Sequence, residues 1–346
     1  MTHNTSLPDA KAADNLRIVA IGGGSGLSSL LHGLKKYVRP SPADTPALDI
    51  AAVVTVTDDG GSSGRLRREF EVLPPGDIRN CMVALSEDEG LLSRLFQYRF
   101  EAGRGLKGHS FGNLFLTALT DITGDFQQAV KLSSEVLAIA GRIYPSTSAN
   151  VALEAVLEDG RSVVGETKIS RSKCRIERIR LRPPRCRPLA ETLAAIADAD
   201  LITLGPGSLF TSVIPNLLVQ GIPQAIRRSP AIKAYFVNLM WQPGETMRFR
   251  ASDHVRAIHN HARGGDLLDY VVVNTRGLRP SLARRYASAE ARPVENDLDG
   301  LAEMGLHVVA RDLLLESARV RHDPEAIAAV AIELAIEGRL RRRKTA

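Results

Sequence analysis

The sequence predicts an α/β protein with a Rossmann-like, three-layer fold around a mainly parallel sheet. A short apolar run, an abrupt turn of small residues and a helical pattern follow one another at residues 18–27, 53–65 and 200–209. This order is typical of a strand that leads through a loop into the N-terminus of a helix. Residues 49–57 are also apolar enough to be buried on both faces of a parallel sheet.

The hydrophobic periodicity predicts the remaining elements in chain order. Strands are expected at 16–21, at 49–57, before Gly205, and at 234–238, 268–274 and 306–311. Helices are expected at 27–37, 91–100, 114–120, 126–137, 189–197, 252–261 and 324–339. Ser252 is the expected N-cap of one of these helices, and Asp77 is expected to cap a further helix at 81–85.

We expect a single α/β domain over residues 16–320. A disordered polar tail precedes it at 1–15, and a C-terminal helix with a basic tail follows at 321–346. Within the domain, the largely helical segment at about 64–138 is an insertion between strands, and we expect it to cap the site.

A small β-hairpin subdomain is expected at about 150–182. Residues 151–157 and 162–169 alternate between apolar and polar around Asp159-Gly160, a dipeptide that favours a hairpin turn. A basic strand at 173–181 extends the hairpin and alternates arginines with apolar residues.

The composition argues against several classes of protein. The three cysteines, Cys81, Cys174 and Cys186, have no CxxC or zinc-type spacing, so we expect thiols in a reducing cytoplasm. No apolar run approaches the roughly 20 residues that span a bilayer, and residues 1–15 lack the pattern of a secretory signal. We therefore expect a cytoplasmic protein with no membrane span.

The formal net charge of +6 comes from two local patches on a mildly acidic body. Residues 171–187 hold eight Lys or Arg and one Glu, and residues 339–344 hold five Lys or Arg. The first patch has no aromatic residues on which bases could stack. Its pattern instead fits a strand with a solvated arginine face, so no nucleic-acid partner is expected.

The first glycine loop is the strongest candidate for binding a phosphate. It consists of Gly22, Gly23, Gly24, Ser25 and Gly26. Glycines let the backbone approach a ligand, and the N–H groups of the following helix favour an anion. The loop lacks the Lys-Ser/Thr pair of a Walker A motif, and Leu27 interrupts the Rossmann fingerprint.

The second loop adds two adjacent carboxylates, Asp58 and Asp59, followed by Gly60, Gly61, Ser62 and Ser63. Such carboxylates could hold magnesium, bind a hydroxylated substrate or act as a base. A third candidate anion loop contains Gly205, Pro206, Gly207 and Ser208. His109 and Asn113 are candidates for ligand hydrogen bonding, because no nucleophile elbow or third catalytic partner accompanies them.

Eight ordered motifs show that the chain resembles the gluconeogenesis factor family, the YvcK-type proteins. The resemblance covers roughly residues 17–315. The motifs are IGGGSGLS from Ile21, VTDDGGSSGRLR from Val56, LPPGDIRNC from Leu73, LFQYRF from Leu95, GHSFGNL from Gly108, LGPGSLFTSVIPNLL from Leu204, QPGET from Gln242 and SDHVRAI from Ser252. The glycine loop and the aspartate pair also resemble the wider superfamily of CofD-type 2-phospho-L-lactate transferases.

The resemblance implies a Rossmann-like fold that binds a uridine-diphosphate sugar, of the UDP-N-acetylglucosamine or UDP-glucose type. It implies a role in cell shape and wall synthesis during growth on gluconeogenic carbon, in the bacterial cytoplasm, and no firm catalytic activity. One stretch departs from the family pattern: Met247-Arg248-Phe249-Arg250 stands where Asp-Gly-Tyr-Thr is expected. If that loop contacts the ligand, the departure affects specificity.

With the resemblance included, further residues join the loops named above as candidate ligand-binding residues. They are Arg65, Asp77, Arg79, Asn80, Asn216 and Asn238. No cofactor is required under this reading, although magnesium at Asp58 and Asp59 remains open. Cell-wall synthesis proteins and a second copy of the chain, in a homodimer, are the expected partners.

Two enzymatic alternatives stay open. The first is a transferase that moves a phospholactyl-type group from a nucleotide donor in deazaflavin coenzyme biosynthesis, with Asp58 and Asp59 as catalytic residues. The second is an NAD-type oxidoreductase, which the interrupted fingerprint disfavours. Dependence on a metal distinguishes the transferase from a binding protein.

Overall fold

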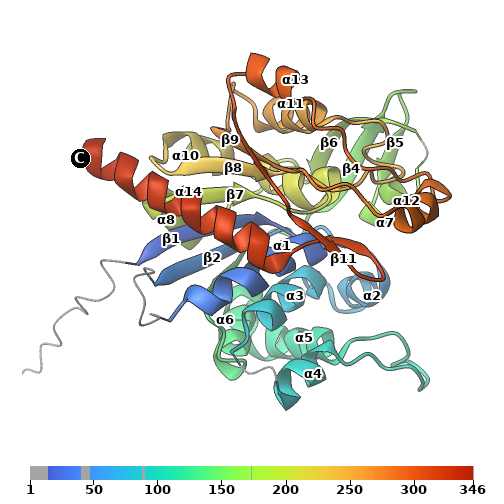
Figure 1. The fold of residues 1–346 in the computed structure, drawn as a ribbon. Coiled ribbons are helices and arrows are strands. Elements are labelled where there is room, and N and C mark those ends of the chain that lie inside the picture. Colours follow the sequence, from blue (N-terminus) through green and yellow to red (C-terminus); the bar gives the residue numbers. More distant parts are fainter. Residues whose placement is uncertain (1–14, 40–46, 88–89, 173, 346) are drawn as a thin grey trace, which may run out of the picture.

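The computed structural model describes residues 15–39, 47–87, 90–172 and 174–345. Its centre is a sheet of seven parallel strands in the order β10-β9-β8-β7-β1-β2-β3 (Figure 1). The strands are β1 (Leu16–Gly22), β2 (Leu48–Val54), β3 (Arg142–Pro145), β7 (Leu201–Leu204), β8 (Ile232–Phe236), β9 (Tyr270–Asn274) and β10 (His307–Arg311). The expected α/β class with a mainly parallel sheet is confirmed.

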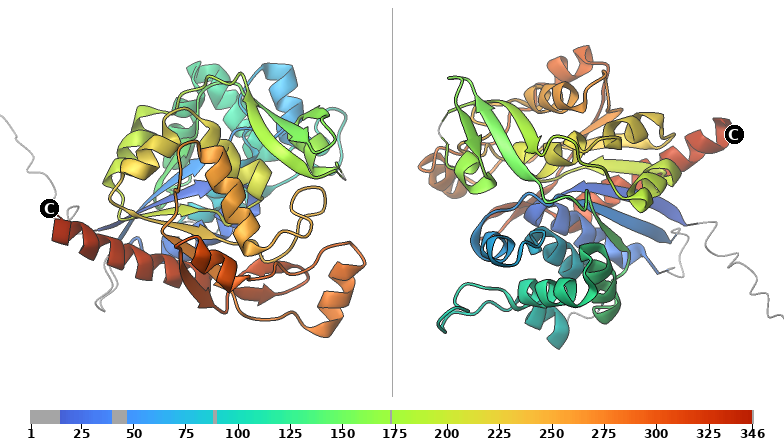
Figure 2. Two further views of the ribbon diagram at one scale, coloured as in Figure 1. Left: turned by 90° about the horizontal axis from the view of Figure 1, so that it is seen from above. Right: turned by 180° about the vertical axis from the view of Figure 1, so that it is seen from behind.

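Helices cover both faces of the sheet and give it three layers (Figures 1 and 2). On one face α1 (Gly24–Leu34) packs between α3 (Gly76–Leu85) and α14 (Pro324–Thr345). The other face carries α8 (Ala190–Asp198), α9 (Ile214–Leu218), α10 (Ile222–Arg228) and α11 (Ala251–Ala262). The central strands β1 and β2 are almost fully buried between these layers, as their apolar runs predict.

The helical segment between β2 and β3 is the crossover that joins these two neighbouring strands. It contains α2 (Gly61–Phe70), α3, α4 (Leu91–Gln97), α5 (Phe111–Thr123) and α6 (Phe126–Val136). Its first helix, α2, follows the carboxyl end of β2, whereas α4, α5 and α6 lie beyond the β3 edge of the sheet (Figure 1). Only the beginning of this segment therefore borders the candidate site.

The hairpin subdomain is a three-stranded antiparallel sheet. Its order is β5 (Ser162–Val164), β4 (Ala152–Leu157) and β6 (Ile176–Arg182). The prediction that the second strand runs to residue 169 was wrong, because Gly165 has a φ of 104° and leads into α7 (Glu166–Ser170). The basic strand does extend the hairpin, by pairing with β4.

Both predicted capping residues lie inside their helices instead. Helix α11 begins at Ala251 with Arg250 as its N-cap, so Ser252 stands in the first turn and donates its backbone N–H to Asp297 at 2.9 Å. Helix α3 begins at Gly76, which places Asp77 in its first turn without a capping bond. Each side chain is thereby free for a tertiary contact.

The C-terminal segment belongs to the main body of the fold. A short hairpin of β11 (Leu314–Glu316) and β12 (Val320–His322) precedes α14, and Arg339 of this helix donates to the fully buried Asp200 at 2.8 Å. The remaining helices are α12 (Pro280–Ala287), α13 (Leu298–Glu303), a 3-10 turn at Lys35–Tyr37 and a π-helical turn at Leu209–Val213. The expected tail at 1–15 lies almost wholly outside the described residues.

In the described ranges no single helix has the length and apolar character needed to cross a membrane. One bent pair, Leu209–Leu218 with Ile222–Arg228, meets the length and composition criteria together. Most of the apolar side chains of this pair are buried in the core.

Candidate functional site

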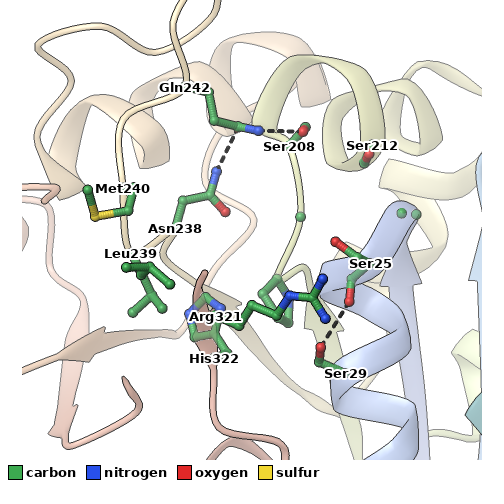
Figure 3. Close-up of a pocket in the computed structure, with 16 residues that line it drawn as sticks. Ser25, Ser29, Ser208, Ser212, Asn238, Leu239, Met240, Gln242, Arg321 and His322 are labelled. Atoms are coloured by element: carbon green, nitrogen blue, oxygen red, sulfur yellow. Dashed lines mark hydrogen bonds between the residues drawn. The ribbon is translucent and has the colours of Figure 1, made fainter. Parts of the chain in front are cut away.

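The sheet has a topological switch point between β1 and β7. From β1 the chain continues to β2 and β3 on one side, and it later returns to β7, β8, β9 and β10 on the other. The loops after two such strands diverge toward opposite faces, and open α/β sheets bind ligands in the crevice between them. A cavity of about 220 Å³ lies at this place, and we call it the switch-point cavity (Figure 3).

The glycine loop after β1 forms the first wall of the cavity. Helix α1 begins at Gly24, which has a φ of 64°, and its N-cap residue Gly23 has no side chain with which to cap it. The N–H groups in the first turn of a helix favour an anion. Gly23, Gly24, Ser25 and Gly26 all line the cavity, as does Ser29 one turn further along α1.

The loop after β7 forms the second wall and touches the first. Pro206, Gly207 and Ser208 line the cavity, and the Gly205–Pro206 peptide bond is cis. A Cβ atom on Gly26 would lie 2.5 Å from the carbonyl oxygen of Pro206, so only glycine allows the two loops to approach this closely. The structure therefore brings the first and third predicted loops together.

Two amide side chains after β8 form the third wall. Gln242 donates through Nε2 to Ser208 Oγ at 2.6 Å, and its Oε1 accepts from Asn238 Nδ2 at 3.2 Å (Figure 3). Asn238 was predicted from the sequence, whereas Gln242 was noted only as part of a motif. Amides both donate and accept hydrogen bonds, so this wall suits a base edge or sugar hydroxyls.

The fourth wall comes from β12, nearly 300 residues after the glycine loop, and was not predicted. The guanidinium of Arg321 points toward Ser25 and Ser29, which line the same cavity (Figure 3), and it forms no ion pair within the described part of the chain. Next to it, His322 Nε2 donates to the carbonyl of Val237 at 3.1 Å, and burial lowers the pKa of His322 to about 4. The wall thus offers one cation, Arg321, beside a neutral imidazole.

Carboxylates gather on the other side of the glycine loop. A Cβ atom on Gly23 would lie 2.6 Å from Asp77 Oδ2, and the Gly24 N–H donates to the same carboxylate. Burial, and then the charge of Asp58, raises the pKa of Asp77 to about 7. The same two causes raise the pKa of Glu166 to about 9. This cluster therefore holds at least one proton at neutral pH.

The adjacent aspartates Asp58 and Asp59 have different surroundings. Asp58 faces the carboxylate cluster, and its Oδ1 accepts from Gly60 N–H at 2.8 Å. Asp59 Oδ1 accepts from the backbone N–H of Thr167 at 2.8 Å and from its hydroxyl at 2.7 Å. Asp59 therefore caps the first turn of α7 and fastens the hairpin subdomain to the loop after β2.

Predicted residues on α2, on α5 and just before α5 hold these two helices together beside the cluster. Ser62 Oγ lies 3.0 Å from His109 Nδ1, and Asn113 Nδ2 donates to Ser63 Oγ at 3.4 Å. Burial, followed by the charge of Arg65, lowers the pKa of His109. None of these side chains is among those that line the described switch-point cavity.

The other predicted residues support the site from outside the cavity. Arg65 donates to the carbonyl of Lys107 at 2.8 Å, and Arg79 donates to Asn80 Oδ1 at 2.5 Å. Asn216 is fully buried, and its Nδ2 donates to the carbonyl oxygens of Ser212 at 2.8 Å and of Gly22 at 3.3 Å. Asn216 thus holds Gly22, the last residue of β1, in place.

Among the described residues, no group of three or more His, Cys, Asp or Glu side chains is arranged to hold a metal ion. Magnesium at Asp58 and Asp59 stays a prediction. Binding there would compete with the hydrogen bonds that Asp59 Oδ1 accepts from Thr167. Cys81, Cys174 and Cys186 are free thiols.

Comparisons with known proteins agree with this architecture. The family model described as 2-phospho-L-lactate transferase CofD matches residues 18–314. A gluconeogenesis factor of Bacillus subtilis is 46% identical over 92% of this chain and 98% of its own length, and one of Halalkalibacterium halodurans is 44% identical over 91% and 95%.

Solved structures agree as well. The crystal structure of a UPF0052 family member from Bacillus halodurans has a TM-score of 0.86 and 43% identity, over 92% of this chain and 99% of that one. From the family model and these relatives, the chain belongs to the gluconeogenesis factor family, within the CofD-like superfamily.

Proposed function

We propose that the chain binds a nucleotide sugar, of the UDP-N-acetylglucosamine or UDP-glucose type, in the switch-point cavity. In this proposal it is a regulator rather than an enzyme and needs no metal to hold its ligand. The homologues named gluconeogenesis factors support a role in growth on gluconeogenic carbon. The proposed output is cell shape and cell-wall synthesis in the bacterial cytoplasm, through contact with cell-wall synthesis proteins.

The observation that carries the proposal is the convergence of three anion-binding features on one cavity. These features are the N-terminus of α1, the glycine turn after β7, and the guanidinium of Arg321. A diphosphate needs several N–H donors and a cation at once, and an Arg fork supplies two parallel donors to phosphate oxygens. The amides of Asn238 and Gln242 are then placed to bind the base or the sugar.

Replacing Arg321 tests this proposal. Arg321→Ala removes one charged hydrogen-bond donor, and such bonds contribute about 1.5–3 kcal/mol. Calorimetric titration with UDP-N-acetylglucosamine should therefore show affinity weakened about tenfold or more. Arg319→Ala is the matched control, because Arg319 precedes the same strand and does not line the cavity. Equal affinity in the two variants would contradict the proposed place of the diphosphate.

The transferase alternative has one specific observation in its favour. Asp58, Asp77 and Glu166 lie beside the glycine loop, with the pKa values of Asp77 and Glu166 raised, and such groups are common at catalytic sites. The model that matches the chain is also that of a transferase. Under this alternative, binding requires magnesium and the nucleotide donor is consumed. Recovery of intact UDP-N-acetylglucosamine after incubation with magnesium would favour the regulator.

A further inference from the structure

A second cavity, of about 570 Å³, lies between the hairpin subdomain and the start of α11. Its walls are Cys174 and Arg175 before β6, the loop Gly244–Arg250, and the first turns of α11. A hydrogen bond of 3.0 Å from Ile179 N–H to His261 Nε2 holds β6 against α11. Four arginines line this cavity, namely Arg175, Arg248, Arg250 and Arg256. We call it the arginine cavity.

Two of the four arginines already have acidic partners. Arg256 pairs with Asp253, and Arg250 Nε lies 3.8 Å from Glu295 Oε2. Neither Arg175 nor Arg248 forms an ion pair with any described residue. Four arginines and three acids, Asp253, Glu158 and Glu245, line the cavity, which leaves a surplus of one positive charge, or of two where Glu245 is neutral.

The remaining acids on the wall are Glu158 and Glu245. Glu245 is only 6% exposed, and its Oε1 accepts from Ser170 Oγ at 3.1 Å. Its Oε2 is buried, and the Phe210 backbone N–H and the Thr211 hydroxyl lie against this carboxylate. Burial raises the pKa of Glu245 to about 7, so much of this group is neutral at physiological pH. A neutral carboxyl does not repel an anionic ligand as a carboxylate would.

The unpaired arginines stand on a loop with a defined conformation. Arg248 has a φ of 62°, a left-handed conformation that is uncommon for a residue other than glycine. The Arg175 guanidinium lies over the Phe249 ring, 5.5 Å from its centre. Trp241 Nε1 donates to the Phe249 carbonyl at 3.1 Å and ties the loop to the core.

We propose that the arginine cavity binds a small phosphate ester and is a second ligand site, separate from the switch-point cavity. One phosphate dianion neutralises both unpaired guanidinium groups. Their planar forks match phosphate oxygens in bidentate geometry.

A single short loop connects the two cavities. Gln242, at its beginning, donates to Ser208 on the wall of the switch-point cavity at 2.6 Å. Gly244 and Glu245, two and three residues later, line the arginine cavity. A ligand that orders this loop therefore also orders Gln242. This coupling would make the phosphate ester a regulator of nucleotide-sugar binding, and only this part of the inference rests on the proposed function.

The test is a titration of the full chain with glycerol 3-phosphate in the absence of any nucleotide sugar. Binding is measured by calorimetry and by the fluorescence of Trp241, the single tryptophan of the chain. Arg175→Gln and Arg248→Asn should each weaken binding about tenfold or more, the loss of one charged hydrogen bond. Asparagine is chosen at position 248 because it tolerates the left-handed conformation.

Arg180→Gln is the control, because Arg180 is an exposed residue of β6 outside the cavity, and it should bind as the unmodified chain does. Arg321→Ala should also leave this binding unchanged. No binding to the folded chain, equal binding of succinate, or displacement by UDP-N-acetylglucosamine would overturn the second site. Failure of UDP-N-acetylglucosamine to bind anywhere would instead overturn the proposed function alone.

Discussion

Two glycines of the same loop, Gly22 and Gly26, have different steric surroundings. A Cβ atom at position 22 would lie no closer than 3.7 Å to any neighbour, an ordinary contact, whereas one at 26 would lie 2.5 Å from the Pro206 carbonyl oxygen. Gly26→Ala should therefore push the two loops apart and destabilise the fold by about 1–3 kcal/mol. Gly22→Ala should have little effect. Urea unfolding of both variants checks this, and equal midpoints would contradict the packing of the two loops.

The carboxylate cluster predicts a pH dependence of stability. Glu166 has a folded-state pKa of about 9, above its usual value, so the folded protein binds more protons than the unfolded chain over this interval. The free energy of unfolding should therefore fall as pH rises from about 5 to 9, by up to about 1.4 kcal/mol per pH unit for one proton. Asp77, with a pKa of about 7, contributes in the same direction over the lower part of this range.

Glu166→Gln isolates this effect, because glutamine imitates the protonated acid at every pH. Thermal melts between pH 5 and 9 should show that the stability of the variant declines less steeply than that of the unmodified chain. Parallel curves would mean that Glu166 is ionised in the folded state at neutral pH.

At the scale of elements, the contact between Asp59 and Thr167 joins the hairpin subdomain to the main sheet. Removing a helix cap costs about 1 kcal/mol, so Asp59→Ala and Thr167→Ala should each lower stability by about that amount. Because the Thr167 hydroxyl and the Asp59 carboxylate share one contact, the double variant should lose less than the sum of the two. Chemical denaturation of all three variants measures this coupling, and simple additivity would show that the contact contributes nothing.

Element types could be predicted from the sequence more securely than element ends. Buried strands such as β1 and β2 have short, β-branched apolar runs, which predict a strand at these positions. The second hairpin strand ends at Gly165, whose φ is 104°, and Asp59, more than a hundred residues away, caps the helix α7 that follows. The predicted caps Ser252 and Asp77 have tertiary partners instead, namely Asp297 and the Gly24 N–H. Local sequence holds no signal for such long-range contacts.

At the scale of the whole molecule, the sequence located the glycine loops but not the complete cavity. A strand, a glycine turn and a helix can be recognised within about ten residues, so the loops after β1 and β7 were found. Arg321 reaches the cavity only because β12, in a separate two-stranded sheet, packs against α1. The predicted homodimer and the wall-synthesis partners stay predictions.

A crystal structure of the chain with UDP-N-acetylglucosamine would show whether the diphosphate of a nucleotide sugar lies between the loops after β1 and β7. We predict phosphate density against the backbone N–H groups of Ser25 and Gly26, within hydrogen-bond distance of Arg321. Phosphate density in the arginine cavity, or beside Asp58 with magnesium, would contradict it.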